Sequence, residues 1–474
     1  MKRIAIIGGG ISGLSAAFEI EKQKIQNAHV EYALFEASAR CGGVIRTERV
    51  GDCIVEAGPD SFLTEKLWAA DLCRELGLGD QLIGSNDSGR TTYILVKGRL
   101  VPLPDGMMFM VPTKLASTFF SPLFSLSTKL GMIREWFYRP SHKTSEVSVA
   151  EFVERHYGRE MVERVADPLL AGVYGGSADD LSVSAVLPRF VQIEAKSGSL
   201  GRAMIAARKG RTAAVPAQPL FTSLKNGMQQ MTDSLLARIP ATNCRLGTRV
   251  EAVKSESSKW LVITDGRRTE EFDGIIIALP AYLGAQILGS ANSDLAADLA
   301  AIRYSSSVTV ALAYDANVRA ALPAGFGFLV RRSENKRMLA ATFVHNKFPH
   351  RAPENMALIR CFLGGTRDES VGKNSDSEIE AVVRRELQQI LGIKAKPLFV
   401  RVYKWERAMA QYELGHGARI QRIRSTVSGA PGLALAGNAY GGIGVPDCVR
   451  SGSEAAAKIF EDLQIAQPAI QHVR

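Results

Sequence analysis

Cysteine is scarce in this sequence, and the six cysteines that occur stand far apart. No Cys-x-x-Cys pair is present among Cys41, Cys53, Cys73, Cys244, Cys361 and Cys448. Zinc cages and disulfide frameworks both need several cysteines at short, regular spacings. The sequence therefore predicts no metal site and no disulfide scaffold. Reduced thiols of this kind are typical of a cytosolic protein.

Long runs of one charge are also missing. The chain of 474 residues carries 58 Lys and Arg against 48 Asp and Glu, a net charge of +10, but its basic residues are scattered. Proteins that bind nucleic acid usually gather such residues into a tract or patch. We therefore expect no nucleic-acid partner. An anionic membrane surface or an acidic small molecule remains compatible with the positive charge.

No apolar stretch is long enough to cross a bilayer. The N-terminal apolar run is interrupted by three glycines and shows no cleavage-site pattern, which argues against a signal peptide. The least charged window, residues 115–128, is short and contains proline and several hydroxyls. Residues 113–138 have the composition of amphipathic helices with basic faces. We expect a cytoplasmic protein that makes at most peripheral contact with the inner face of the membrane.

A strand, a glycine-rich turn and a helix follow one another at the N-terminus. Residues 2–8 have the pattern of a buried strand, and Gly8-Gly9-Gly10-Ile11-Ser12-Gly13 has the Gly-x-Gly-x-x-Gly spacing. In such a motif the first glycine makes the tight turn, the second lets a pyrophosphate approach the backbone, and the third lets helix and strand pack closely. The N–H groups at the start of the helix favour an anion. The motif predicts a phosphate site.

The next strand supports this interpretation, because residues 30–36 end on Glu36, where the hydroxyls of an adenosine ribose would lie. Strand, turn, helix, strand and acid thus occur in the order of a dinucleotide-binding βαβ unit. A second glycine-rich junction, residues 437–448, leads from a strand into a C-terminal helix. The N-terminus of that helix would stabilise the negative charge of a reduced flavin ring, and an NAD enzyme does not need it. The pattern favours FAD.

Several separated motifs resemble those of one family. They are the glycine pair Gly42-Gly43, the segment Glu56-Ala-Gly-Pro-Asp-Ser-Phe62, the stretch Pro168-Leu-Leu-Ala-Gly-Val-Tyr-Gly175, and Trp405 to His416 with its Gln-Tyr and Gly-His pairs. Together they span nearly the whole chain. The chain resembles the FAD-dependent protoporphyrinogen and coproporphyrinogen III oxidases of the flavin amine oxidase superfamily, and it is most similar in form to the soluble enzymes of Gram-positive bacteria.

The resemblance implies a function. These enzymes remove six electrons from a porphyrinogen in haem biosynthesis, pass them through flavin N5 to dioxygen and release hydrogen peroxide. Coproporphyrinogen III is the favoured substrate and protoporphyrinogen IX the alternative. The resemblance also suggests neighbouring haem-pathway enzymes as partners. The sequence leaves two other classes open, a flavin amine oxidase and a non-enzymatic flavin or tetrapyrrole carrier.

The resemblance also implies a fold of class α/β plus α+β with three parts. A Rossmann-like FAD-binding domain would comprise residues 1–75, 218–282 and 405–474. A substrate-binding domain with an inserted antiparallel sheet would comprise residues 76–96, 188–217 and 283–404. A helical domain of the membrane-contact type would occupy residues 97–187.

The cofactor contacts implied by the motifs and the resemblance lie in both glycine-rich junctions and in the segments between them. They are Gly8, Gly9, Gly10, Ile11, Ser12, Gly13, Glu36, Ala37, Gly43, Val44, Gly58, Pro59, Asp60, Ser61, Val250, Trp405, Gly437, Ile443, Gly444 and Val445.

Candidate residues for the substrate comprise two cations and no acid or base. The carboxylates of a porphyrinogen would bind Arg or Lys at the mouth of a cavity, and Lys66 and Arg90 are the candidates. The seven histidines are dispersed and show no Ser/His/Asp grouping, so no acid or base can be assigned. A structural role is the favoured interpretation for His416.

Overall fold

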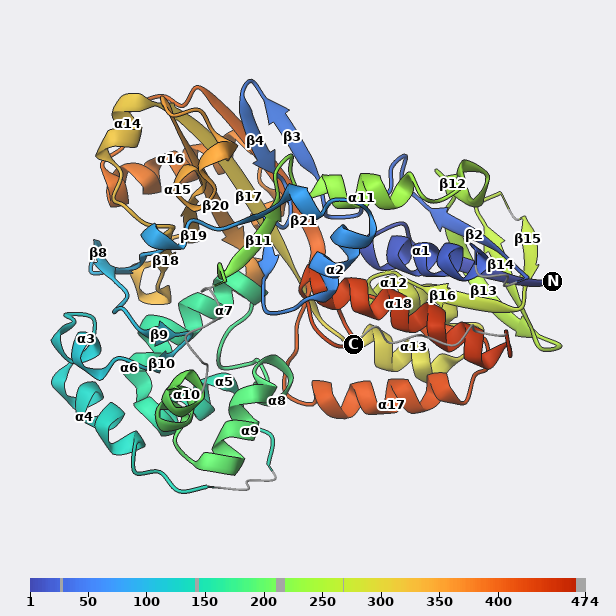
Figure 1. Cartoon of the computed structure of the whole chain (residues 1–474), viewed down its shortest axis with the longest axis horizontal. Coiled ribbons are helices and arrows are strands. Elements are labelled where there is room, and N and C mark those ends of the chain that lie inside the picture. Colours follow the sequence, from blue (N-terminus) through green and yellow to red (C-terminus); the bar gives the residue numbers. More distant parts are fainter. Residues whose placement is uncertain (26–28, 141–144, 210–217, 267, 466–474) are drawn as a thin grey trace.

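A parallel sheet with helices and a larger, mostly antiparallel sheet form the two main parts of the molecule, and a helical region adjoins the second sheet (Figure 1). The predicted fold class, α/β plus α+β, is confirmed. The computed structural model describes residues 1–25, 29–140, 145–209, 218–266 and 268–465. Residues 210–217 and 466–474, which the predicted domain division includes, lie outside the described residues.

The parallel sheet has β1 at its centre. Its order is β12 (Cys244–Leu246), β2 (Val30–Glu36), β1 (Lys2–Ile7), β16 (Gly274–Ile277) and β22 (Leu433–Leu435). Ile6 pairs with Leu34 on one side and Ile276 on the other, and all three side chains are fully buried. Strands covered on both faces need such continuous apolar runs, which explains why residues 2–8 and 274–277 could be assigned from sequence.

Two helices that begin at glycine-rich junctions pack against each other beside this sheet. They are α1 (Ile11–Ile25) and α18 (Val445–Asp462), and they approach each other closely at Gly452. A Cβ atom at Gly452 would lie 2.2 Å from the backbone oxygen of Ser12, so a larger residue would separate the helices. The other helices of this part are α2 (Trp68–Glu75), α11 (Gln229–Leu236), α12 (Ala281–Leu288), α13 (Ser293–Ala300) and α17 (His416–Ser428).

The larger sheet has seven strands. Its order is β21 (Phe399–Ala410), β17 (Tyr304–Asp315), β20 (Met356–Gly364), β19 (Met338–Phe343), β18 (Gly327–Val330), β7 (Thr92–Val96) and β8 (Arg99–Pro102). All neighbours are antiparallel except β18 and β7. The helices α14 (Ala316–Ala321), α15 (Val344–Lys347) and α16 (Asp376–Leu391) accompany it. A capping box at Ser375 begins α16.

The helical region lies next to β18 and β7 (Figure 1). It contains α3 (Leu115–Phe120), α4 (Leu126–Glu135), α5 (Val149–Tyr157), α6 (Arg159–Met161), a π-helical turn at 162–166, α7 (Asp167–Tyr174), α8 (Val183–Val186), α9 (Pro188–Ser197) and α10 (Leu200–Lys209). Glu135 of α4 accepts hydrogen bonds from Ser199 and from the backbone N–H of Leu200, so α10 is tied to α4. None of the described helices combines the length and apolarity needed to cross a bilayer.

Smaller sheets connect these parts. They are β3 (Thr47–Val50) with β4 (Cys53–Glu56), β5 (Phe62–Leu63) with β11 (Phe221–Leu224) and β6 (Leu82–Gly84), β9 (Met107–Met108) with β10 (Val111–Pro112), and β13 (Val250–Glu256) with β14 (Lys259–Thr264) and β15 (Thr269–Phe272). The hairpin of β3 and β4 carries the chain from the parallel sheet to the edge of the seven-stranded sheet (Figure 1). The segment that follows, residues 57–61, therefore lies where the two main sheets meet.

Candidate cofactor site

The first glycine-rich turn leaves room for a ligand at the N-terminus of α1. Gly8 has a φ of +108°, and a Cβ at Gly13 would lie 1.9 Å from the Gly8 carbonyl oxygen, so both positions require glycine. A Cβ at Gly10, in contrast, would meet no protein atom within 4 Å. The turn is thus closed at Gly8 and Gly13 and open at Gly10, where a pyrophosphate would approach α1.

Glu36 at the end of β2 lies against this turn. Its Oε2 accepts a hydrogen bond of 2.7 Å from the Gly9 N–H, and its Oε1 accepts one of 2.8 Å from the Ser38 N–H. These two hydrogen bonds fix the Glu36 carboxylate beside the turn of residues 8–13, which forms the glycine cradle. Ala37 lies between Glu36 and Ser38 in the chain. The position and chemistry of Glu36 fit a group that binds ribose hydroxyls.

The second glycine pair packs directly on the first turn. The Gly42 N–H donates a hydrogen bond of 2.7 Å to the Gly9 carbonyl, and a Cβ at Gly43 would lie 3.3 Å from the Gly10 Cα. Arg40 holds this loop by donating to the carbonyls of Cys41, Gly43 and Ile45. The predicted continuation of the cofactor site through Gly43 is therefore adjacent to the phosphate turn.

The turn at residues 58–61 packs against the loop that follows β2. A Cβ at Gly58 would lie 1.9 Å from the Val44 carbonyl oxygen, so only glycine allows this turn to reach the loop after β2. The Trp405 Nε1–H donates a hydrogen bond of 2.9 Å to the Ala57 carbonyl, which joins β21 of the seven-stranded sheet to the same turn. The loop after β2, the turn at residues 58–61 and the distant strand β21 thus meet here.

The C-terminal junction is held by an ion pair. The Lys66 Nζ lies 2.6 Å from the Asp447 Oδ2 in the first turn of α18, and the Asp447 side chain is only 4% exposed. A Cβ at Gly442 would collide with this carboxyl group. Among the predicted contacts, Gly444 is the N-cap of α18 and Gly437 donates to the Ser451 hydroxyl. Val250 begins β13 and is buried.

The two substrate candidates occupy different environments. Lys66 neutralises Asp447, which gives it a partner within the protein. Arg90 lies just before β7, its side chain is 55% exposed, and its nearest acid is Asp87 at 3.8 Å. The structure therefore does not bring Lys66 and Arg90 into one ion-pair network, and their role toward a substrate stays a prediction.

A buried ionic cluster, which the sequence did not reveal, surrounds Asp60. Both carboxylate oxygens lie 3.1 Å from the Lys347 Nζ, which also donates to the Ser61 hydroxyl, and Arg360 lies 3.8 Å from Asp60. Burial alone would raise the pKa of Asp60, but the charges of Lys347 and Arg360 hold it well below its usual value. Arg360 also donates to the Gly58 carbonyl. The cluster fixes the turn that carries Gly58.

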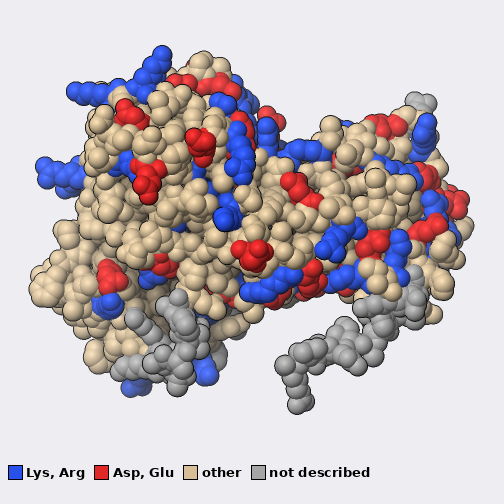
Figure 2. All heavy atoms as spheres, turned by 45° about the horizontal axis from the view of Figure 1, so that its top comes forward, with Lys and Arg blue, Asp and Glu red and all other residues tan. Residues whose placement is uncertain are grey.

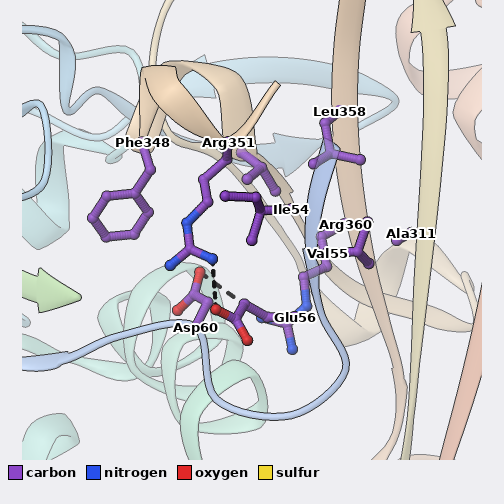
Figure 3. Close-up of a pocket in the computed structure, with 10 residues that line it drawn as sticks. Ile54, Val55, Glu56, Asp60, Ala311, Phe348, Arg351, Leu358 and Arg360 are labelled. Carbon is purple, nitrogen blue, oxygen red and sulfur yellow. Dashed lines mark hydrogen bonds and ion pairs between the residues drawn. The ribbon is translucent and has the colours of Figure 1, made fainter. Parts of the chain in front are cut away.

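A second buried pair lies next to this cluster. Figure 3 shows the Arg351 guanidinium directed at Glu56, and the two charged groups are 2.6 Å apart with at most 4% of either side chain exposed. Thr47 and the Met228 N–H donate to the same carboxylate. The cavity enclosed between these residues has a volume of about 10 Å³, which is far too small for a flavin or a tetrapyrrole. The pair is therefore structural.

Hydroxyl and imidazole groups cluster near the C-terminal junction. The Tyr412 hydroxyl donates to the Asn438 carbonyl and accepts from the Gly442 N–H at 2.7 and 2.8 Å. His416 stacks on Tyr412 with ring centres 4.1 Å apart, and burial lowers the pKa of this histidine to about 4. The imidazole is thus neutral and stacked, and a structural role for His416 stays a prediction.

In the part of the chain that the structure describes, no three His, Cys, Asp or Glu residues gather in a group that could hold a metal ion. Figure 2 shows basic and acidic side chains interspersed on the visible face, without a block of one sign. The glycine cradle, Glu36 and the second helix N-terminus fit FAD by their spacing and chemistry.

Comparisons with known proteins agree with this geometry. The family model described as flavin containing amine oxidoreductase matches residues 11–460. Coproporphyrinogen III oxidase of Bacillus subtilis is 34% identical over 463 residues, which cover 96% of this chain and 97% of that protein. Mitochondrial protoporphyrinogen oxidase of Nicotiana tabacum is 29% identical, with 98% and 95% covered. A crystal structure from Exiguobacterium has a TM-score of 0.85 at 30% identity and covers 98% of this chain and 99% of its own. A putrescine oxidase at 18% identity and a TM-score of 0.71 shares the fold.

Proposed function

The chain belongs to the family of flavin-containing amine oxidoreductases, and we propose that within this family it oxidises a porphyrinogen in haem biosynthesis, with coproporphyrinogen III as its substrate. It is an FAD-dependent oxidoreductase. We infer the substrate from one observation, the identity of 34% with a coproporphyrinogen III oxidase over 96% of the chain. The alternative substrate, protoporphyrinogen IX, is supported by the tobacco relative.

The residues of the two glycine-rich junctions would hold FAD. The open face at Gly10 would receive the pyrophosphate, Glu36 the ribose, and the N-terminus of α18 the flavin ring. When bound, FAD would supply the redox chemistry by accepting a hydride equivalent from the porphyrinogen and passing electrons to dioxygen. Cys448 is buried within α18, so we expect the flavin to be bound without a covalent link.

The protein itself would contribute position and charge. Asp60, Lys347 and Arg360 fix the turn at Gly58 at the meeting point of the two sheets. Because Asp60 is already neutralised by two cations, it would remain ionised over the physiological pH range and could not act as an acid. We propose that the turn positions the flavin and that orientation, more than proton transfer by a side chain, is its contribution.

The number of substrate carboxylates separates the two porphyrinogens. Coproporphyrinogen III carries four propionates, and protoporphyrinogen IX carries two propionates with vinyl groups in place of the others. A site for the tetra-acid should offer extra cationic or amide partners, whereas a site for the di-acid should bury the vinyls in apolar walls. The net charge of +10 favours the tetra-acid slightly.

Side-by-side measurement of kcat/KM under air tests the choice of substrate. We expect coproporphyrinogen III to be preferred, and a clear preference for protoporphyrinogen IX would overturn that choice and leave the oxidase assignment intact. Anaerobic mixing separates the enzyme classes, since a porphyrinogen oxidase should lose its flavin absorbance with porphyrinogen and keep it with amines. Bleaching by an amine alone would favour the amine oxidase alternative.

We also propose that the three-part division of the chain and a cytoplasmic location with peripheral membrane contact apply to this protein. The exposed face of α3 and α4 supports the membrane contact, because Phe120, Leu126 and Leu130 are each more than half exposed there. The predicted boundaries would shift slightly on structural grounds. β8 pairs with β7 and α10 is tied to α4, which favours a helical part from about residue 103 to 209.

A further inference from the structure

Two cysteines that are far apart in the sequence meet beside the cofactor cradle. Cys41 lies in the loop after β2, and Cys244 is the first residue of β12, which pairs with β2. Their Sγ atoms are 4.0 Å apart, a distance at which two thiols are in contact but not bonded. Among the described residues no other pair of cysteines is joined by a hydrogen bond between thiols.

Cys41 also touches the first glycine-rich turn. A Cβ atom at Gly9 would lie 2.8 Å from the Cys41 Sγ, and the next residue, Gly42, donates its N–H to the Gly9 carbonyl at 2.7 Å. The same Gly9 donates to Glu36. A change at Cys41 is therefore transmitted directly to the segment that would cradle the pyrophosphate and the ribose.

The two thiols are chemically unequal. The hydrogen bond between them raises the pKa of the Cys41 thiol and lowers the pKa of the Cys244 thiol. Cys244 is partly exposed, whereas Cys41 is buried. Thiolate character and access both control the rate of thiol oxidation, so Cys244 would react first and Cys41 would be the resolving thiol.

The remaining cysteines lack these features. Cys73 is fully buried, and burial raises the pKa of its thiol to about 12. Burial likewise raises the pKa of Cys448 to about 12 and that of Cys361 beyond the usual range. Thiols of this kind are poor nucleophiles. They provide internal controls within the same molecule.

We propose that Cys41 and Cys244 form a peroxide-sensitive dithiol whose oxidation to a disulfide weakens the retention of FAD. In the first step the Cys244 thiolate attacks hydrogen peroxide, the O–O bond breaks, and a sulfenic acid and hydroxide form. In the second step the Cys41 thiol attacks that sulfur, and a disulfide and water form. Peroxide accepts two electrons and the two thiols supply them. The inference does not depend on the proposed substrate, because peroxide from any source suffices.

The bond would distort the cradle. A disulfide requires an S–S distance of about 2.05 Å, so the two sulfur atoms must approach by about 2 Å. Cys41 lies on a loop, whereas Cys244 is held in strand β12, so Cys41 would be the residue that moves. Movement of Cys41 toward β12 would displace Gly42 from the Gly9 carbonyl. The geometry at Gly10, where FAD would bind, would change with it.

The test treats purified FAD-loaded enzyme with hydrogen peroxide and maps its thiols by alkylation and mass spectrometry. We expect peptides containing Cys41 and Cys244 to become linked while Cys73 and Cys361 stay reduced. The rate of flavin release should rise severalfold and return to its starting value after dithiothreitol. Since peroxide is added directly, the result is independent of any activity toward porphyrinogens.

Variants sharpen the test. Cys41→Ser should leave a Cys244 sulfenic acid that dimedone traps, and flavin release should no longer respond to peroxide. Cys73→Ala, which removes a thiol outside the pair, should respond as the wild type does. The proposal is overturned if peroxide leaves Cys41 and Cys244 alkylatable at doses that begin to oxidise Cys73. It is equally overturned if the linked enzyme releases flavin no faster than the reduced enzyme.

Discussion

Gly10 and Gly13 stand in the same turn but meet different constraints. A methyl group at Gly13 would overlap the Gly8 carbonyl, whereas one at Gly10 would point into open space. We therefore expect Gly10→Ala to fold with an unchanged thermal midpoint in the flavin-free state and to lose FAD retention. Gly13→Ala should be destabilised even without flavin. The ratio of flavin to protein absorbance after gel filtration, together with melting curves of the apoproteins, measures both effects. Equal melting of the two apoproteins would contradict the argument.

The buried pair of Glu56 and Arg351 gives a second prediction at the residue scale. Arg351→Met would leave the Glu56 carboxylate buried without its cation, which typically costs about 3–5 kcal/mol. The thermal midpoint should fall by several degrees. Adding Glu56→Gln to this variant should recover part of the loss, because the uncompensated charge is removed.

An exposed pair supplies the control for Arg351. Arg303 is paired with Glu369 and Glu413, and its side chain is 58% exposed. Arg303→Met should therefore change stability by less than about 1 kcal/mol. Equal shifts of the midpoint for Arg303→Met and Arg351→Met would show that burial does not determine the effect.

Individual residues differed in how far the sequence could reveal them. The glycines and Glu36 were identifiable because their tasks are set by local spacing along one βαβ unit. The partners of Asp60 were not, since Lys347 at the end of α15 and Arg360 on β20 lie some 300 residues later. Neither side chain belongs to a local motif. The contact of Cys41 with Cys244 was missed for the same reason, and the scarcity of cysteine even argued against a pair.

At the scale of elements, a buried histidine couples three helices of the helical region. The His156 ring on α5 lies 3.4 Å from Glu135 of α4 and 3.2 Å from Glu194 of α9, and Arg155 also approaches Glu194. Burial alone would lower the pKa of His156, but the two carboxylates raise it above its ordinary value. The protonated form thus stabilises the packing of these helices.

The sign of this pH dependence follows from linkage. Because the folded-state pKa is raised above about 6.5, the stabilisation is complete below that pH and is lost as pH rises through the folded-state pKa. Each unit by which the pKa is raised corresponds to about 1.4 kcal/mol. We expect the thermal midpoint to fall between pH 6 and pH 9 and to fall less in His156→Gln. A variant with the same slope as the wild type would exclude His156 as the source.

Element boundaries were predictable where the pattern was strong. The apolar periodicity of α16, β19 and β20 is regular, and a pattern of this kind allows the bounds of an element to be predicted from sequence. β21 was identified as a motif around Trp405 and not as a strand, since its charged residues obscure the alternation. It nevertheless forms the edge of the large sheet and brings Trp405 to Ala57.

At the scale of the whole molecule, the cofactor site depends on contacts between the two main sheets. Trp405 and Arg360 come from the seven-stranded sheet, and both bind backbone carbonyls of residues 57–58. The apolar runs of the sequence predict the strands of the parallel sheet, and the family resemblance implies the antiparallel sheet. The sequence does not supply the mutual placement of the two sheets, because that placement is fixed by a few buried polar contacts between distant segments.

The helical region lies at one end of the molecule (Figure 1), and several large apolar side chains of α4 and its neighbours are exposed there. Leu126, Leu130 and Ile133 of α4 are spaced along one side of the helix, and Phe120 and Phe137 next to it are 83% and 77% exposed. Lys129 lies over the ring of Phe119, so positive charge adjoins the same face. An apolar surface beside positive charge is suited to contact with the headgroup region of an anionic bilayer. The helices that form it are too short to anchor the protein permanently in the membrane.

We therefore expect the protein to bind vesicles that contain anionic phospholipid and to bind neutral vesicles weakly. Raising the salt from about 0.1 M to about 1 M shortens the screening length from about 10 Å to about 3 Å and should release it. Phe120→Ser combined with Phe137→Ser should weaken binding at low salt, because the inserted apolar area is lost. Leu398→Ser, at a residue 59% exposed just before β21, is the matched control and should bind as the wild type does. Co-sedimentation measures all three proteins, and binding that survives 1 M salt would show that charge does not hold the protein at the surface.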